Sequence, residues 1–195
     1  MKFKKYLKET DKTWRNQEEP DANVNHALLG LLDEAGELAS AFKKEVGYGK
    51  ELDLINVKEE IGDGIFFLTR VVKEVSMPEH LDKMLSHLDE IAAVDIPEEK
   101  LEIMKTYNYS DLAFNLNKPI GLIYEGLATK DDKMIGQAMS DTMSAYANLA
   151  AIFGFTAKEC MTSNIAKLKK RFPDKYSKEK ALKRDLDAER KTLEE

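Results

Sequence analysis

Apolar residues recur along most of this chain at intervals of three and four positions, the spacing of one face of an α-helix. Clusters of Pro, Gly and polar residues interrupt this pattern and mark the expected helix ends. The helix predicted over 25–46 carries apolar residues on more than one face, so we expect it to be buried on most sides. The pattern therefore predicts an all-α fold, an antiparallel helical bundle. The predicted helices cover residues 1–19, 25–46, 57–75, 78–95, 98–116 and 156–172. The stretch over 98–116 is expected to be irregular in its middle, around Tyr107, Asn108 and Tyr109.

Several residues set the expected helix boundaries. Pro20 and the polar residues after it are expected to end the first helix, and Pro173 the last. Asp53 or Asn56 is expected to cap the helix over 57–75, and Thr156 or a neighbour caps the last one. The only tryptophan, Trp14, is expected to anchor the core or an interface, with stacking over a ligand as the alternative.

The length of 195 residues fits one domain of ordinary size. We assign residues 1–173 to a single domain, within which 78–116 is a helical insert. Residues 174–195 form a charged C-terminal tail in which both signs are interspersed. Such a tail is expected to be an exposed helix or a partly disordered arm.

Residues 117–153 repeat part of the earlier pattern. Gly30 to Glu34 is answered by Gly121 to Glu125, and Glu60 to Asp63 by Ala138 to Asp141. This alignment leaves the second segment with half the acids of the first, because alanines replace two of them. The match is short, so both a degenerate internal repeat and a chance likeness remain open. A true repeat would make 117–153 a scaffold. The alanines are Ala128, in place of Glu37, and Ala138, in place of Glu60.

Composition narrows the class of protein. The net charge of −6, with acids and bases mixed along the chain, is unlike the basic stripe of a general nucleic-acid binder. The sequence has no apolar run of about 18 residues, so we expect no membrane span. The basic N-terminus lacks the apolar segment of a secretory signal. The single Cys160 excludes an internal disulfide and a Cys-rich zinc site. The expected absence of a membrane span, of a secretory signal and of a disulfide favours a cytoplasmic location.

The most informative residues are two pairs of acids in apolar segments. Glu34 and Glu37 lie three residues apart, as do Glu60 and Asp63, so each pair shares one face of a helix. The two helices are joined by a short connection, and antiparallel pairing could bring all four carboxylates together. Acids among Leu, Ile and Phe lose hydration and repel one another unless a positive partner compensates them. A divalent metal ion would supply that charge.

The ligand types favour a hard cation. Four carboxylates with no adjacent His or Cys suit Mg²⁺, with Mn²⁺ as a second choice. The natural chemistry is metal-assisted attack of water on a phosphate chain. No GxxxxGK[ST] motif is present, so a Walker nucleotide hydrolase is not expected. A di-iron carboxylate bundle is a weaker alternative because its ExxH pairs are missing, and plain surface charge is the remaining one.

Three sequence blocks carry a family resemblance. They are LLDEAGELASAFKK, then NVKEEIGDGIFFL, and later NIAKLKKRFPDKYS. In this order they resemble the all-α nucleoside triphosphate pyrophosphohydrolases of the MazG type, which are related to the dimeric dUTPases and the phosphoribosyl-ATP pyrophosphatases. The resemblance covers about residues 25–75 and 150–185. About 75 residues separate the second and third blocks, whereas compact members of the family have them close together.

The resemblance implies a MazG-like bundle, usually a dimer or tetramer, that cleaves a nucleoside triphosphate to a monophosphate and pyrophosphate. The long interval departs from the family pattern, and we interpret it as a replacement for a subunit contact, so that one chain mimics part of a dimer. Glu59 could be a further ligand or a water-activating base. The remaining alternative is a non-catalytic interaction or regulatory protein that keeps the fold and binds through residues 78–116. By resemblance, Mg²⁺ is held by Glu34, Glu37, Glu60 and Asp63. The residues expected to contact phosphate are Asn164, Lys167 and Arg171, with Lys43 and Lys44 as weaker candidates. Asn25 and His26 are expected to contact the base or sugar.

Overall fold

A computed structural model of the chain describes residues 1–174, 176–182 and 185–194. In these residues the regular structure is α-helical without strands, which confirms the predicted all-α class. No helix among them is both long and apolar enough to cross a membrane. The helices are α1 (Phe3–Thr10), α2 (Pro20–Tyr48), α3 (Leu54–Val75), α4 (Pro78–Ile91), α5 (Glu98–Lys105), α6 (Tyr109–Thr129), α7 (Asp132–Ile152), α8 (Ala157–Arg171), α9 (Lys178–Leu182) and α10 (Leu186–Glu194).

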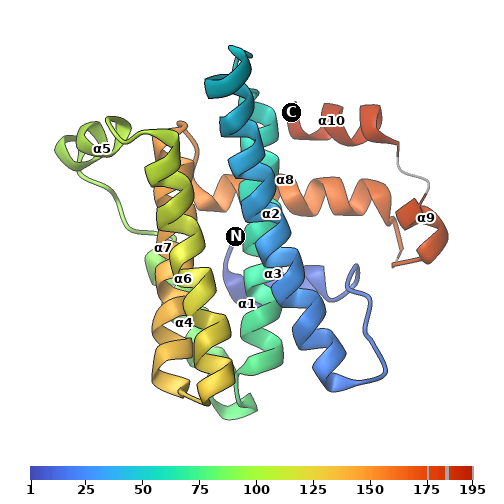
Figure 1. The fold of residues 1–195 in the computed structure, drawn as a ribbon. Coiled ribbons are helices and arrows are strands. Elements are labelled where there is room, and N and C mark those ends of the chain that lie inside the picture. Colours follow the sequence, from blue (N-terminus) through green and yellow to red (C-terminus); the bar gives the residue numbers. More distant parts are fainter. Residues whose placement is uncertain (175, 183–184, 195) are drawn as a thin grey trace.

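Two helical hairpins make the centre of the fold. α2 packs against α3 and α6 packs against α7, with short connections that make each pair antiparallel. The hairpins then join through α2 on α6 and α3 on α7, so four long helices enclose the core (Figure 1). α8 crosses this bundle at a steep angle and packs on α3, and α4 covers α7. The predicted antiparallel bundle is therefore present.

Local sequence explains where the main helices begin and end. The Asp53 carboxylate accepts hydrogen bonds from the backbone N–H groups of Ile55 and Asn56 at 3.0 and 3.2 Å, which caps α3 as predicted. Thr156 caps α8 in a reciprocal capping box with Glu159. Gly49 ends α2 in the left-handed conformation at φ 64°, which a glycine adopts at no steric cost.

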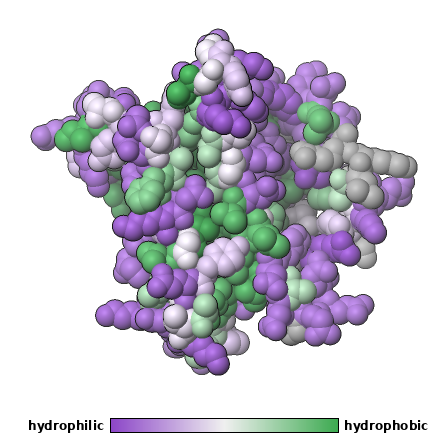
Figure 2. All heavy atoms as spheres, viewed as in Figure 1, coloured by the Kyte–Doolittle hydropathy of each residue, from purple (hydrophilic) through white to green (hydrophobic). Residues whose placement is uncertain are grey.

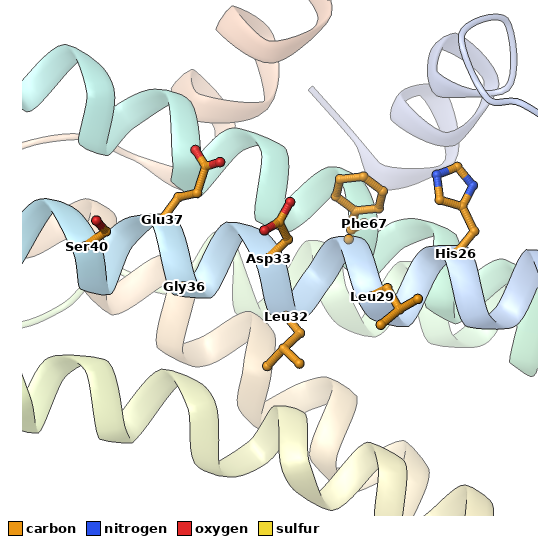
Figure 3. A pocket seen from close by; sticks show the side chains of 9 residues that line it. His26, Leu29, Leu32, Asp33, Gly36, Glu37, Ser40 and Phe67 are labelled. Carbon is orange, nitrogen blue, oxygen red and sulfur yellow. The ribbon is translucent and has the colours of Figure 1, made fainter.

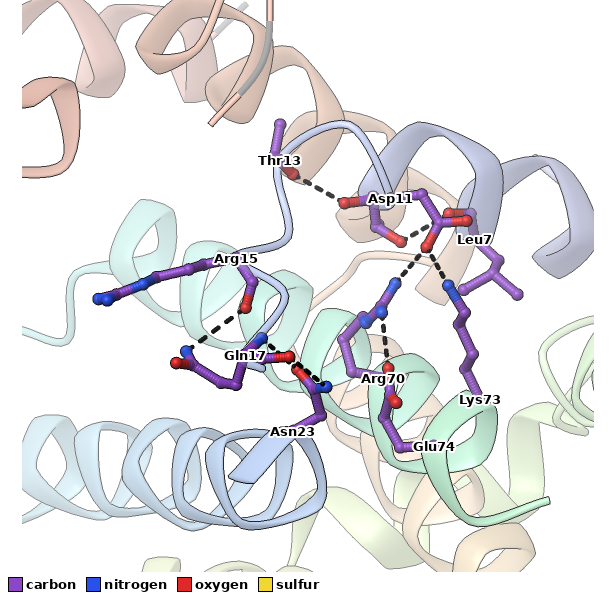
Figure 4. A network of polar contacts seen from close by, with 10 residues as sticks. Leu7, Asp11, Thr13, Arg15, Gln17, Asn23, Arg70, Lys73 and Glu74 are labelled. Atoms are coloured by element: carbon purple, nitrogen blue, oxygen red, sulfur yellow. Dashed lines mark hydrogen bonds and ion pairs between the residues drawn. The ribbon is translucent and has the colours of Figure 1, made fainter. Parts of the chain in front are cut away.

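The N-terminal segment differs from the predicted helix over 1–19. α1 ends at Thr10, and Pro20 begins α2 instead of ending α1, because proline fits the first turn of a helix. Polar contacts hold the intervening loop on α3 (Figure 4): Asp11 accepts hydrogen bonds from Arg70 at 2.5 Å and from Lys73 at 2.7 Å. The second helix is thus longer than expected at its N-terminal end.

The helical stretch over 98–116 has the irregular middle that was expected around residues 107–109. It divides there into α5 and α6, and the Asn108 side chain caps α6 by accepting from the Asp111 N–H at 2.9 Å. α4 ends at Ile91, a turn earlier than expected. The proposed repeat corresponds to most of α6 and to α7, but Glu125 and Asp141 are both exposed and do not form an acidic pair in the core. The internal repeat stays a prediction.

The charged tail was expected to be an exposed helix or a partly disordered arm. In its described part, α10 packs on α8 and α3 and buries Leu193 and Glu189. Arg190 on its exposed side pairs with the α3 cap Asp53 at 2.6 Å. This packing was not visible in the pattern because Leu193 is the only apolar residue of α10 that is buried.

Candidate metal centre

Three of the predicted carboxylates converge where α2 and α3 pair. One oxygen each of Glu34, Glu37 and Glu60 lies within 4.8 Å of the others. Glu60 is only 4% exposed, Glu34 is partly buried and Glu37 is exposed. The antiparallel hairpin thus brings an acid from its second helix against a pair from its first.

Burial makes this arrangement electrostatically costly. Desolvation, and then the negative charges of Asp63 and Glu60, raise the pKa of Glu34 well above its usual range. Desolvation also raises the pKa of Glu60, and the hydrogen bond with Glu34 lowers it in part. The Lys167 ammonium lowers the pKa of Glu34, but its effect is the smallest of these, because Lys167 is paired with Glu59 and Asp63. Closely spaced carboxylate oxygens that have no ion-pair partner among the described residues fit a hard divalent cation.

Asp63 faces a different partner. Its two carboxylate oxygens accept hydrogen bonds from the Asn164 amide and the Lys167 ammonium of α8. Lys167 also donates to Glu59 at 2.9 Å, and its side chain is 1% exposed. Asp63 and Glu59 raise the pKa of Lys167 against the opposing effect of its burial. The four expected ligands therefore separate into a three-carboxylate cluster and an Asp63 that is already paired.

Asn164 and Lys167 were expected to contact phosphate directly. The structure buries both and directs them to Asp63, because α8 packs tightly on α3 at Gly62. A Cβ atom at Gly62 would lie 2.8 Å from the Cys160 carbonyl oxygen, so only glycine permits this approach. The two residues therefore orient Asp63.

Sequence reasoning missed Tyr6. Its buried hydroxyl donates to the Asn164 side-chain oxygen at 2.7 Å, which leaves the Asn164 amide nitrogen to donate to Asp63. The sequence does contain a signal that other elements pack closely around Asp63, because a glycine lies on each side of it and glycine within a buried helix marks the close approach of another element. Gly62 admits α8, and Gly64 admits a side chain of α7.

A cleft of about 640 Å³ adjoins the acids. Glu34 and Asp63 lie on its wall, and Arg15 and Arg171 provide positive charge. Of the candidate base-contacting residues, Asn25 and His26 both line it, whereas Lys43 and Lys44 do not. Its aromatic and imidazole side chains are Trp14, His26, Phe66, Phe67, Phe172 and Tyr176.

Trp14 is an anchor of this cleft. Its ring stacks on His26 at 4.4 Å between centroids, and the Arg70 guanidinium lies 4.4 Å from the ring centre. Trp14 is therefore sandwiched and 5% exposed, as expected of a core residue. Burial, and then the charges of Arg15 and Arg70, lower the pKa of His26, so its imidazole is neutral at pH 7 and can both donate and accept hydrogen bonds.

Arg171 reaches the cleft but is not free in this conformation. Its guanidinium forms a two-point ion pair with Glu189 of α10, with hydrogen bonds of 2.8 and 2.5 Å. A second, open hollow of about 780 Å³ follows the outer face of α2 and exposes Glu37 (Figure 3). The two hollows share the residues His26, Leu29 and Phe67, so one surface runs from the aromatic cleft to the acids.

This surface combines an aromatic recess, arginines at its edge and a cluster of carboxylates. No protein-family model, curated protein or solved structure was found to match this chain. The case for a function therefore rests on the geometry of the site.

Proposed function

We propose that this protein is a Mg²⁺-dependent nucleotide pyrophosphohydrolase that converts a nucleoside triphosphate to a monophosphate and pyrophosphate. The observation that carries the proposal is the convergence of Glu34, Glu37 and Glu60 beside a cleft with aromatic walls. Carboxylates suit a hard cation and its phosphate ligands, and flat apolar walls suit a base. The family resemblance points to the same reaction.

Glu34, Glu37 and Glu60 would hold the metal, with Mn²⁺ as a substitute for Mg²⁺. The bound cation would supply charge neutralisation for the phosphates and acidify a water molecule. Asp63 lies on the cleft wall and accepts hydrogen bonds from two donors that fix its carboxylate. It is better placed than Glu59 to take a proton from the attacking water, because both acids contact Lys167 but only Asp63 lines the cleft.

The cleft suggests how the rest of the substrate lies. The base would occupy the aromatic recess, where the Asn25 amide and the neutral His26 offer hydrogen bonds. Arg15 lies at the edge as an exposed cation and would face the phosphate chain. Removal of dUTP, dCTP or damaged nucleotides from the nucleotide pool is the biological role that such an activity would serve.

We also infer that the chain associates with a second copy of itself. Leu29 and Leu32 on α2 are 63% and 46% exposed, and Phe114 on α6 is 62% exposed. Hydrophobic side chains gather in the centre of one face of the molecule (Figure 2), and exposed apolar patches commonly mark interfaces. Light scattering of the purified protein measures the assembly directly.

The proposed reaction is tested by incubating the protein with a panel of nucleoside triphosphates and Mg²⁺ and identifying the products. We expect a monophosphate and pyrophosphate from at least one of them. Glu34→Gln and Asp63→Asn should abolish turnover while the fold is retained, as measured by circular dichroism. The matched control is Glu125→Gln, which removes an exposed acid at the equivalent position of α6 and should leave turnover unchanged. Release of a diphosphate and phosphate would overturn the proposed bond cleavage.

One observation favours a second candidate function, a non-catalytic interaction protein. Val94, which precedes α5, is 65% exposed, and Ile103 within α5 is 55% exposed. The insert over 78–116 therefore presents apolar groups to solvent. Absence of turnover across the whole panel, together with no effect of Mg²⁺ on the melting temperature, would favour this reading.

A further inference from the structure

Tyr146 is the most unusual polar residue near the acids. It belongs to α7, in the second helical hairpin, and its side chain is completely buried. Its hydroxyl has no hydrogen-bond partner, although such groups are almost always satisfied in folded proteins. A phenylalanine would fill the same space without this desolvation cost, so the hydroxyl calls for a functional explanation.

The position of the hydroxyl is set by Gly64. A Cβ atom at Gly64 would lie 2.2 Å from the Tyr146 hydroxyl oxygen, so the hydroxyl occupies the space that a side chain would fill there. Gly64 lies four residues after Glu60 and therefore on the same face of α3. The Cα–Cβ direction in a helix also tilts towards its N-terminus, which places the hydroxyl on the Glu60 side.

The charges of the cluster act on this residue. Burial, and then the charges of Glu34, Glu60 and Asp63, raise the pKa of Tyr146 above its usual value. The hydroxyl keeps its proton and can donate it in a hydrogen bond. The three carboxylates whose charges act on it are all hydrogen-bond acceptors.

We propose that Tyr146 is a positioning residue whose hydroxyl donates a hydrogen bond to the Glu34–Glu60 pair when these carboxylates bind a divalent cation. This inference rests on the metal site of the proposed function. Carboxylates that ligate a cation keep further lone pairs, and outer hydrogen bonds to these lone pairs orient metal ligands. The buried, unpartnered hydroxyl lies against Gly64, one helical turn from Glu60, and is placed to supply such a bond.

The proposal gives the second hairpin a part in the site. Tyr146 comes from the segment over 117–153, whose own acids Glu125 and Asp141 are exposed. The α3–α7 contact would then carry a donor from one hairpin to the carboxylates of the other. The site would be incomplete in a chain that had only the first hairpin.

The test compares wild type with Tyr146→Phe by calorimetric titration with Mn²⁺ and by thermal unfolding in EDTA. We expect Mn²⁺ affinity to fall about 10- to 100-fold, while the melting temperature in EDTA stays the same or rises. A purely structural role would lower that melting temperature. The control is Tyr109→Phe, which removes a tyrosine hydroxyl that binds Glu45 at 2.7 Å, outside the cluster, and should leave Mn²⁺ affinity unchanged.

The outcomes separate this inference from the proposed function. Unchanged Mn²⁺ affinity in Tyr146→Phe, or a weaker affinity accompanied by a lower melting temperature in EDTA, would overturn the role of Tyr146. A wild-type protein that binds Mn²⁺ but hydrolyses no nucleotide would reject the proposed reaction and leave the Tyr146 test valid. A wild-type protein that binds no Mn²⁺ would reject both the metal site and the role of Tyr146.

Discussion

Replacing Glu34 by glutamine should stabilise the protein when no metal is present. Glutamine has the shape of a protonated glutamate but cannot ionise. In the folded protein, burial and neighbouring acids favour the protonated form of Glu34, whereas in the unfolded chain the carboxyl ionises at its ordinary pKa. Keeping the carboxyl protonated in the folded state at neutral pH therefore costs free energy. The substitution removes that cost, and the glutamine amide can replace the hydrogen bond through which Glu34 lowers the pKa of Glu60.

The sign and size of the effect follow from proton linkage. Below pH 4 the carboxyl is protonated in both states and the substitution should change little. As the pH rises, only the unfolded state releases the proton, so wild-type stability falls by up to about 1.36 kcal/mol per pH unit above a pKa of about 4.3. The upper limit is about 4 kcal/mol at pH 7.5 and about 1 kcal/mol at pH 5. Glu34 keeps some hydration, so we expect about 2 kcal/mol at pH 7.5.

The assay is thermal unfolding in EDTA at pH 5 and pH 7.5. For a chain of this size, 2 kcal/mol corresponds to a melting temperature about 4–8 °C higher at pH 7.5, with a smaller gain at pH 5. Glu125→Gln is the control, because its exposed carboxylate should contribute little at either pH. Addition of Mg²⁺ should raise the melting temperature of wild type and have a much smaller effect on Glu34→Gln. A loss of stability in Glu34→Gln, or a gain that does not depend on pH, would refute the uncompensated burial of this acid.

Two further predictions concern the packing around Asp63. Lys167→Met should lower the free energy of unfolding by about 3–5 kcal/mol, because it leaves two acids without their buried cation. The control, Lys169→Met at an exposed lysine, should lower it by less than about 1 kcal/mol. Similar losses for the two variants in urea unfolding would contradict this prediction. Gly64→Ala should cost about 1–3 kcal/mol or more, because the added methyl group would overlap Tyr146. Gly36→Ala meets no neighbour within 4 Å and should stabilise α2 by up to about 1 kcal/mol. Equal effects of the two alanines on the melting temperature would argue against the tight contact at Gly64.

Much of the bundle could be predicted from helical periodicity and capping residues. The hairpin over 25–75 was foreseen because its apolar positions are dense and its connection is short, and Asp53 and Thr156 cap their helices as expected. The pattern failed where side chains from distant parts of the chain decide the structure. The early end of α1 depends on Asp11 meeting Arg70 and Lys73 of α3, a contact between residues about sixty positions apart.

In the candidate site, too, contacts between adjacent helices could be predicted and contacts between distant parts of the chain could not. Spacing alone placed Glu34 and Glu37 on one helical face and allowed them to meet Glu60, because those relations depend on two adjacent helices. The partner of Asp63 could not be read from the sequence, since Lys167 comes from α8, about a hundred residues later. A lysine near the C-terminal end of a helix is explained by the helix dipole as readily as by phosphate binding. Only the packing of α8 shows that Lys167 is buried against acids.

The contrast between neighbouring acids is the strongest physical reason to expect a ligand here. In the same layer of the fold, Glu59 and Asp63 receive a buried lysine, so the chain can neutralise acids at this depth. Glu34 and Glu60 receive no comparable compensation, although a lysine or an apolar side chain at either position would relieve the strain. A local cost that the surrounding fold sustains is the expected property of a binding site, because the missing positive charge then arrives with the ligand.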